Sequence, residues 1–145
     1  MNNDVYDLDR FISAQEGIYE SVLAELQNGE KRSHWMWFIF PQIDGLGFSA
    51  TTKYYSIKNK EEARHYLNHP VLGPRLLQCT ELLLAIEGKS VREIFDFPDD
   101  KKLKSSMTLF ARVSDPDSVF AHVLEKYFGG ERDERTTSLL DNSSP

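Results

Sequence analysis

Residues 72–87, LGPRLLQCTELLLAIE, indicate the fold class most strongly, because their apolar side chains recur at the spacing of one helix face. Gly88 follows directly, which predicts a long amphipathic helix that ends there. Before this helix, His69 precedes a proline and is biased out of the helical conformation, so another helix is expected to end at His69. After it, Ser90 and Glu93 have the spacing of a capping box and predict a further short helix.

Similar signals predict helices through the first part of the chain. Asp7 is a plausible N-cap for one long run of apolar residues at helical spacing, and Gly29 ends that run. Ser33, Ser49 and Asn59 each stand before a shorter helical pattern, where a side-chain oxygen can accept from the first free backbone N–H groups. These shorter helices are expected over residues 35–40, 50–55 and 60–69.

The last third of the chain continues the pattern. Pro98 precedes DDKKLKSSMTLFARV, which predicts a helix over residues 99–113. Asp115 followed by a proline predicts the N-cap of a helix over residues 116–128, and a pair of glycines ends it. A final short helix is expected in ERTTSLL, residues 134–140.

The chain as a whole is predicted to be one all-α domain of seven or eight short helices. Its 145 residues fit a single domain, and 40% hydrophobic with 28% charged residues is an ordinary composition for a globular protein. No strand-like alternation, internal repeat or linker is present. We expect one domain over residues 1–145, with a frayed N-terminus at about residues 1–6 and a C-terminal tail at about residues 141–145.

Cysteine content and hydropathy point to the cytoplasm. Cys79 is the single cysteine, so no intrachain disulfide can form. The first residues, MNNDVYDLDR, lack the basic start and apolar core of a signal peptide. The longest apolar stretch is far shorter than the roughly 20 residues that a membrane span needs. We therefore expect a cytoplasmic location and no membrane partner.

The charge distribution favours a small anionic ligand over a long polyanion. The net charge of −6 argues against general nucleic-acid binding. Residues 1–30 carry a net −6 and residues 113–145 a net −4, whereas residues 31–112 carry a net +4. A basic centre between acidic ends suits a small anion. The alternative is a random scatter of charges in a short chain.

The stretch KRSHWMWFIFPQIDGLG, residues 31–47, places two tryptophans beside basic and polar residues. In a helix, Trp35 and Trp37 lie on different faces, so one core face cannot hide both. A tryptophan that is not hidden offers a flat face that can stack on a base. Core packing is the alternative for each ring, and a buried tryptophan then needs a partner for its N–H group.

A second polar cluster occurs in KKLKSSMTLF, residues 101–110. Lys102, Ser105, Ser106 and Thr108 place a cation and three hydroxyl groups within about one helical turn of each other. Such a group suits phosphate or ribose oxygens. The alternative is a solvated face above core residues.

Familiar catalytic and cofactor motifs are absent from the sequence. It has no GxGxxG, no Walker loop and no GxSxG nucleophile elbow. His65 and His69 are four residues apart, but no acid of an HExxH motif lies between them and no third ligand is apparent. Cys79 lies in a helix that looks buried, which predicts an inert thiol. We expect no metal site and no cofactor.

Several stretches together resemble one known family over nearly the whole chain. KRSHWMWFIFPQIDGLG, EEARHYLNHPVLGPRL, PDDKKLKSSMTLF and YFGGERDERT, in this order and spacing, resemble the family called domain of unknown function 1810. The run HWMWFIFPQ is rare and makes the resemblance specific. It implies a compact, mainly helical bacterial domain and no defined activity.

A weaker resemblance links the chain to the NADAR, or YbiA-like, fold, whose members act on ADP-ribose derivatives as N-glycosidases. KYYSI at residues 53–57, GPR at residues 73–75 and SMTLF at residues 106–110 are similar to elements of that family. The glutamate of its EHYY motif has no counterpart here, because Thr51 and Thr52 precede Lys53. Without that carboxylate, glycosidic cleavage loses its obvious acid or base.

These patterns predict a helical protein with a basic, aromatic cleft that binds a nucleotide or an ADP-ribose-like anion. The expected cationic or donor groups are Lys31, His34, Arg75 and Lys102, the stacking groups are Trp35, Trp37 and Tyr54, and the groups for hydroxyls or phosphate oxygens are Gln42, Ser49, Ser105, Ser106 and Thr108. If the protein is an enzyme, His34 is the best catalytic acid or base, because histidine ordinarily titrates near neutral pH. The expected class is then a hydrolase or transferase on a nucleoside derivative.

Two alternatives compete with this cleft. In the first, the protein is a non-catalytic interaction domain whose exposed aromatic residues bind another protein. In the second, the aromatic residues form a packed core, and His34 and Gln42 only cap helices. The cleft requires Trp37, Gln42, Arg75 and Ser105 to converge on one partly open pocket.

Overall fold

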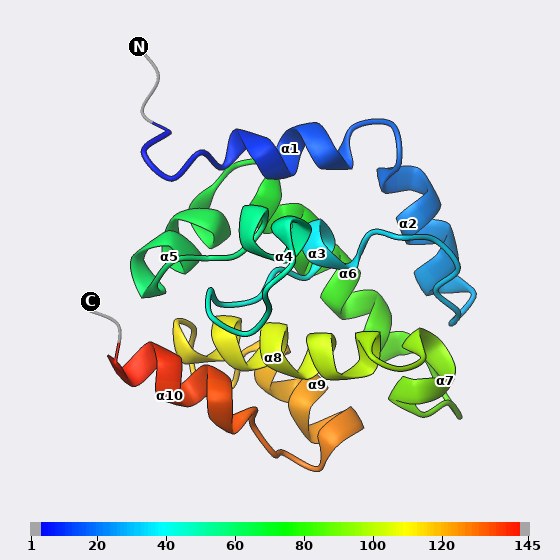
Figure 1. Cartoon of the computed structure of the whole chain (residues 1–145). Coiled ribbons are helices and arrows are strands. Elements are labelled where there is room, and N and C mark those ends of the chain that lie inside the picture. The colour runs from blue at the N-terminus through cyan, green and yellow to red at the C-terminus, as the bar shows by residue number, and fades with distance from the viewer. Residues whose placement is uncertain (1–3, 143–145) are drawn as a thin grey trace.

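The structure is a computed structural model that describes residues 4–142 (Figure 1). The helices in this part of the chain are α1 (Asp9–Gln15), α2 (Tyr19–Gln27), α3 (Met36–Ile39), α4 (Ala50–Tyr54), α5 (Lys60–Asn68), α6 (Leu72–Ala85), α7 (Val91–Phe95), α8 (Asp99–Arg112), α9 (Val119–Phe128) and α10 (Glu134–Asn142). Apart from one isolated parallel bridge between Ile43 and Ile57, these residues contain no β-structure. The all-α class is confirmed. The expected frayed ends fall partly on residues 1–3 and 143–145, which lie outside the described residues.

The described residues form ten helices instead of the expected seven or eight, and the first long helix is the clearest difference. Gly17 has a φ of +77°, which is unsuited to helix and divides the apolar run into α1 and α2. Asp7 is not the N-cap, because its φ is +52°. The Asp4 carboxylate instead accepts hydrogen bonds from the backbone N–H groups of Leu8 and Asp9, at 2.6 and 2.9 Å.

Three predicted helix starts are confirmed by their capping hydrogen bonds. The Ser49 hydroxyl accepts from the N–H of Thr52 at 3.1 Å, and the Asn59 side chain accepts from the N–H of Glu62 at 2.9 Å. Ser90 heads a complete capping box at the start of α7. In each case the cap and its partner lie three residues apart, so a local pattern suffices to predict them.

Two other predicted caps are wrong. The Ser33 hydroxyl donates to the Glu25 carboxylate at 2.6 Å and does not cap α3. Asp115 is not the N-cap of α9. Ser118 takes that position, because its hydroxyl accepts from the N–H of Ala121 and α9 begins at Val119. At α9 another polar side chain takes the capping role, whereas Trp35 precedes α3 and provides no side-chain cap.

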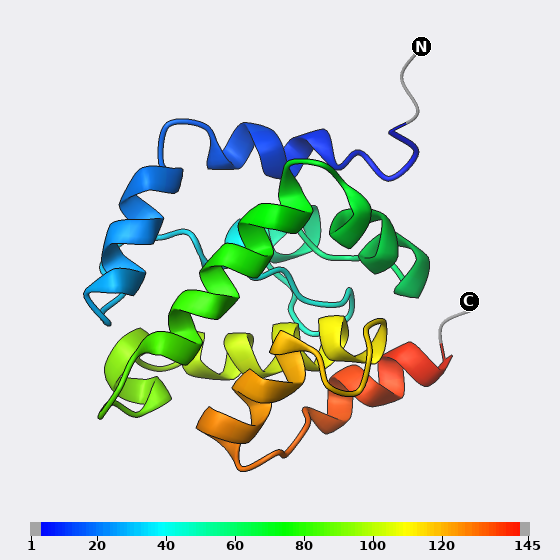
Figure 2. The ribbon, with the colours of Figure 1, turned by 180° about the vertical axis from the view of Figure 1, so that it is seen from behind.

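Helices α6 and α8 organise the core. Helix α6 packs against α2, α5 and α9, and Figure 2 shows it crossing the back of the molecule between them. Helix α8 packs against α7, α9 and α10 and buries Leu103, Met107 and Phe110 completely. No helix within residues 4–142 has the length and apolar character needed to cross a membrane.

A buried ion pair joins α1 to α5. The guanidinium of Arg10 and the carboxylate of Glu62 lie 2.8 Å apart, and both side chains are almost fully buried. Arg10 also donates to the backbone carbonyls of Tyr6, Asp7, Tyr54 and Ser56. The other oxygen of Glu62 accepts from the N–H of Lys58 at 2.8 Å. These contacts satisfy both buried charges. Through the Tyr54 carbonyl and the Glu62 carboxylate, Arg10 also connects α1 to α4 and α5.

Candidate functional site

Trp35 belongs to the core. Only 1% of its surface is exposed, and its ring packs against Phe40 and Phe95. Its N–H donates to the Glu25 carboxylate at 3.0 Å, which supplies the partner that a buried indole needs. Burial works to raise the pKa of Glu25, but hydrogen bonds from Ser33, Arg32 and Trp35 outweigh it and hold the pKa below its usual value. In this structure, the Trp35 ring has no face open to a ligand.

Trp37 lies on the other side of α3 and is only partly buried. The Lys102 ammonium stands over its ring, 4.6 Å from the centroid, so α3 and α8 meet through a cation–π contact. Lys102 also lies 3.5 Å from the Asp99 carboxylate, whose other oxygen is 2.8 Å from Lys31. The Lys31 side chain is only 7% exposed, and its ammonium group is engaged by Asp99.

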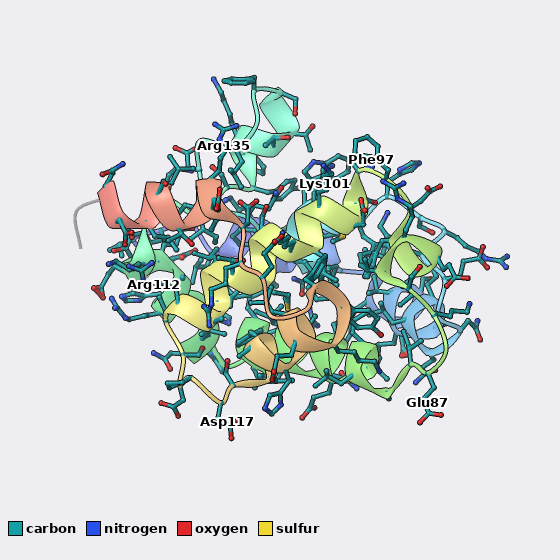
Figure 3. The ribbon with its side chains drawn as sticks, turned by 90° about the horizontal axis from the view of Figure 1, so that it is seen from below. Glu87, Phe97, Lys101, Arg112, Asp117 and Arg135 are labelled. Carbon is teal, nitrogen blue, oxygen red and sulfur yellow. The ribbon has the colours of Figure 1, made fainter. Side chains whose placement is uncertain are left out.

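A concave pocket of about 310 Å³ opens beside this contact, and we call it the basic pocket. Its lining comes from the loop before α4, from α4 itself, from the start of α8 and from the turn into α10: Gln42, Leu46, Gly47, Thr52, Pro98, Lys101, Lys102, Ser105, Asp133 and Arg135. Figure 3 shows Lys101 and Arg135 on the side of α8 that faces α4. Segments far apart in sequence therefore build one site.

The basic pocket has a positive balance of charge. Lys101, Lys102 and Arg135 line it together with a single carboxylate, that of Asp133. One oxygen of Asp133 is occupied at the start of α10, where it accepts from the backbone N–H and the hydroxyl of Thr136. Lys102 is also paired with Asp99, which does not line the pocket, but three cations against these two carboxylates still leave a positive balance that favours an anionic ligand.

A shallower depression of about 520 Å³ lies on the neighbouring side of α4, and we call it the aromatic groove. It is lined by Trp37, Phe38, Ala50, Thr51, Tyr54 and Tyr55. The Tyr54 side chain is 54% exposed, and its ring meets that of Tyr55 edge to face at 4.8 Å. The groove is thus an open, mainly aromatic surface.

The structure brings together only part of the predicted site. Gln42, Lys102 and Ser105 line the basic pocket. Trp37 and Tyr54 line the aromatic groove. Ser49 lines neither depression, but its hydroxyl caps α4 and donates to the hydroxyl of the pocket residue Thr52 at 2.8 Å. The remaining predicted residues are engaged elsewhere or are absent from the lining.

Arg75 and His34 lie away from the basic pocket. Arg75 donates to the side chain of Gln15 at 3.1 Å and stacks over the ring of Tyr19. His34 is exposed in the segment before α3 and does not line the pocket. Of the four residues expected to converge, Gln42 and Ser105 line the basic pocket, Trp37 lines a second depression beside α4 and Arg75 lies elsewhere.

Ser106 and Thr108 face the interior of the protein. Both are buried, and the Ser106 hydroxyl has no hydrogen-bond partner within the described residues. The Thr108 hydroxyl donates to the carbonyl of Lys104 at 2.8 Å and accepts from the N–H of Asp133 at 2.9 Å. Thr108 thus joins α8 to the turn before α10, and its role is structural.

Seven of the ten lining residues were not expected from sequence, among them Thr52, Lys101 and Arg135. Lys101 stands next to Lys102 in KKLK, so the same motif contained its signal. Arg135 lies in an acidic segment, and no local pattern connects it to Gln42. It reaches the site because its guanidinium donates to the carbonyl of Gly45 at 3.1 Å.

The two closely spaced histidines have structural contacts. The His65 ring packs against Tyr6 at 5.1 Å, and the His69 Nδ1 accepts from the N–H groups of Val71 and Leu72 at the start of α6. Among residues 4–142, no cluster of three or more histidine, cysteine, aspartate or glutamate side chains could hold a metal ion.

The Cys79 thiol is expected to be chemically inert in the native protein. Burial raises its pKa to about 12, although the contacts with Tyr19 and Arg75 oppose that change. At pH 8 the reactive thiolate is therefore scarce, and the sulfur is inaccessible. We expect a disulfide reagent to label native protein at least about 1,000-fold more slowly than protein unfolded in guanidinium chloride. The absorbance of the released thiol measures both rates. Rapid stoichiometric labelling without denaturant would contradict this burial.

Comparison with known proteins identifies relatives without an assigned activity. A family model described as "Protein of unknown function (DUF1810)" matches residues 5–140. The crystal structure of the conserved hypothetical protein Rv1873 from Mycobacterium tuberculosis is 52% identical, with a TM-score of 0.94, over 97% of this chain and 100% of that chain. No curated protein shows significant similarity. These matches give no support to the weaker NADAR resemblance.

Proposed function

This chain belongs to the DUF1810 family of proteins of unknown function, and we propose that it binds a small phosphate-bearing anion in the basic pocket. The ligand class we favour is a nucleotide or an ADP-ribose-like molecule. One observation carries the proposal: the side chains of Lys101, Lys102 and Arg135 converge on one concavity. Asp133 and Asp99 offset part of the repulsion between these cations, and a bound anion would offset the remainder.

The polar groups of the pocket match the oxygens of a sugar phosphate. Arginine presents a planar fork of donors that binds two phosphate oxygens at once, whereas lysine acts as a compact charge. Thr52 and Gln42 add a hydroxyl and a carboxamide, which can bind ribose hydroxyls or further phosphate oxygens. The volume of about 310 Å³ lies at the lower end of small-molecule sites.

The proposal covers binding and assigns no catalytic step. A hydrolase or transferase needs a proton donor or acceptor within hydrogen-bond reach of the ligand. His34 is not among the lining residues, and the lining carboxylate, Asp133, holds the start of α10. We therefore give His34 no role in the pocket.

A thermal-shift screen tests the proposal. The panel contains inorganic phosphate, AMP, ADP, NAD and ADP-ribose, measured with wild type and with Lys102→Gln and Arg135→Gln. A ligand at 100 times its Kd stabilises the native state by about 2.7 kcal/mol, which raises Tm by roughly 5–10 °C in a chain of this size. We expect both variants to lose most of that shift.

Arg64→Gln is the matched control, because Arg64 is exposed on α5 and does not line the pocket. It should respond to ligand like wild type. An equal loss in Arg64→Gln would indicate a diffuse charge effect and not a site. No shift with any ligand at millimolar concentration would refute the proposal.

A second candidate function is protein binding without catalysis, and two exposed aromatic side chains favour it. Phe48 is 83% exposed and Phe97 is 58% exposed. Phe97 lies near the pocket, since the Lys101 ammonium is 5.6 Å from its ring centroid. Apolar surface of this kind is often covered by a partner. If no ligand in the screen raised Tm, protein binding would be favoured over small-molecule binding.

A further inference from the structure

The aromatic groove and the basic pocket are neighbours that share a boundary. Thr51 lines the groove and Thr52 lines the pocket, so consecutive residues of α4 face the two depressions. On the opposite side, Lys102 lines the pocket and stands 4.6 Å above the ring of Trp37, which lines the groove. The two sites therefore meet at α4 on one side and at the Lys102–Trp37 contact on the other.

The groove has the lining that a flat ring requires. Phe38, Tyr55 and Tyr54 form a continuous series of ring contacts, at 5.4 and 4.8 Å between centroids, with Trp37 beside them. Tyr54 and Trp37 keep part of their surface open to solvent. Aromatic side chains stack on any base, because every base has a π-face.

We propose that the groove binds the aromatic ring of the ligand whose phosphate occupies the basic pocket. This inference rests on the proposed function and names the ligand as a phosphate ester that carries a flat heteroaromatic ring, such as a nucleoside monophosphate. The positive charge of the pocket selects the phosphate, and the groove selects the ring. Lys102 lies at the junction, in reach of both.

Paired ligands separate the two contributions. Ribose 5-phosphate carries the sugar and phosphate of AMP without its base, so it tests the pocket alone. In calorimetric titrations of the wild-type protein, AMP should bind about 10-fold more tightly than ribose 5-phosphate, the order expected for one stacked base. The base of AMP should also quench the fluorescence of Trp37, whereas ribose 5-phosphate should not.

Tyr54→Ser is the test variant, because Tyr54 is half exposed and its contact with Arg10 uses only the backbone carbonyl. It should abolish the advantage of AMP and leave the Kd of ribose 5-phosphate unchanged. Phe48→Ser is the matched control, because it removes an exposed aromatic ring that lines neither site. It should retain the 10-fold difference.

The outcomes distinguish this inference from the proposed function. Equal binding of AMP and ribose 5-phosphate, or an AMP advantage that survives Tyr54→Ser, overturns the groove while the anion pocket stands. A similar loss in Phe48→Ser and Tyr54→Ser also overturns it, because the effect would then not be specific to the groove. Binding of neither ligand overturns both the groove and the pocket.

Discussion

Replacing Glu62 with glutamine is expected to lower the free energy of unfolding by about 3–5 kcal/mol. The change leaves the Arg10 guanidinium buried without its counter-ion, 2.8 Å from a neutral amide. A buried charge that loses its partner keeps its desolvation cost and loses the attraction that offset it. Urea unfolding followed by circular dichroism measures the difference.

An exposed ion pair supplies the control for this prediction. Glu30 and Arg32 are 3.1 Å apart, but their side chains are 52% and 75% exposed. Glu30→Gln should therefore change the free energy of unfolding by less than about 1 kcal/mol. Similar values for Glu30→Gln and Glu62→Gln would show that the buried pair is not a major element of stability.

The double variant Arg10→Met with Glu62→Leu should be less destabilised than the sum of its single changes. The single variants each leave one charged group buried alone, whereas the double variant leaves none. It still loses the bonds from Arg10 to four backbone carbonyls, so wild-type stability is not expected to return.

Gly73→Ala should destabilise the protein by about 2 kcal/mol or more, although alanine is the better helix former. Gly73 is the second residue of α6, and a Cβ atom there would lie 2.1 Å from the carbonyl oxygen of Leu67 in α5. That obstacle is backbone, so it cannot rotate away as a flexible side chain would. The start of α6 must therefore move from α5. Thermal and urea unfolding measure the loss.

Glu81→Ala is the control on the same helix. Glu81 is exposed near the middle of α6, so its substitution should change stability by no more than about 0.5 kcal/mol. If Gly73→Ala were as stable as Glu81→Ala, or more stable than wild type, helix propensity would dominate. The close approach of α5 and α6 would then not limit stability.

Predicting helix starts from sequence succeeded where the cap and its partner are close in the chain. Ser49, Asn59 and Ser90 accept from N–H groups three residues ahead, so the pattern contains the whole interaction. It failed at Asp7 because backbone conformation and a carboxylate farther upstream determine that start. It also missed the break at Gly17, since apolar spacing alone does not reveal a positive φ.

The candidate site shows the same division. Lys102 and Ser105 lie about one turn apart on α8, so helical spacing is enough to predict that they are neighbours. Whether Trp35 or Trp37 was buried could not be predicted, because the partners of Trp35 are Glu25 and Phe95, which lie in other helices.

The sequence alone therefore determined the all-α class, most helix positions and one basic, hydroxyl-rich turn of α8, because periodicity and capping are local properties. Tertiary structure decided which polar groups remain available to a ligand. Arg75 is held by Gln15, whereas Arg135 is brought from a distant acidic segment to the pocket. Such choices depend on how helices pack against each other, and no local pattern records that packing.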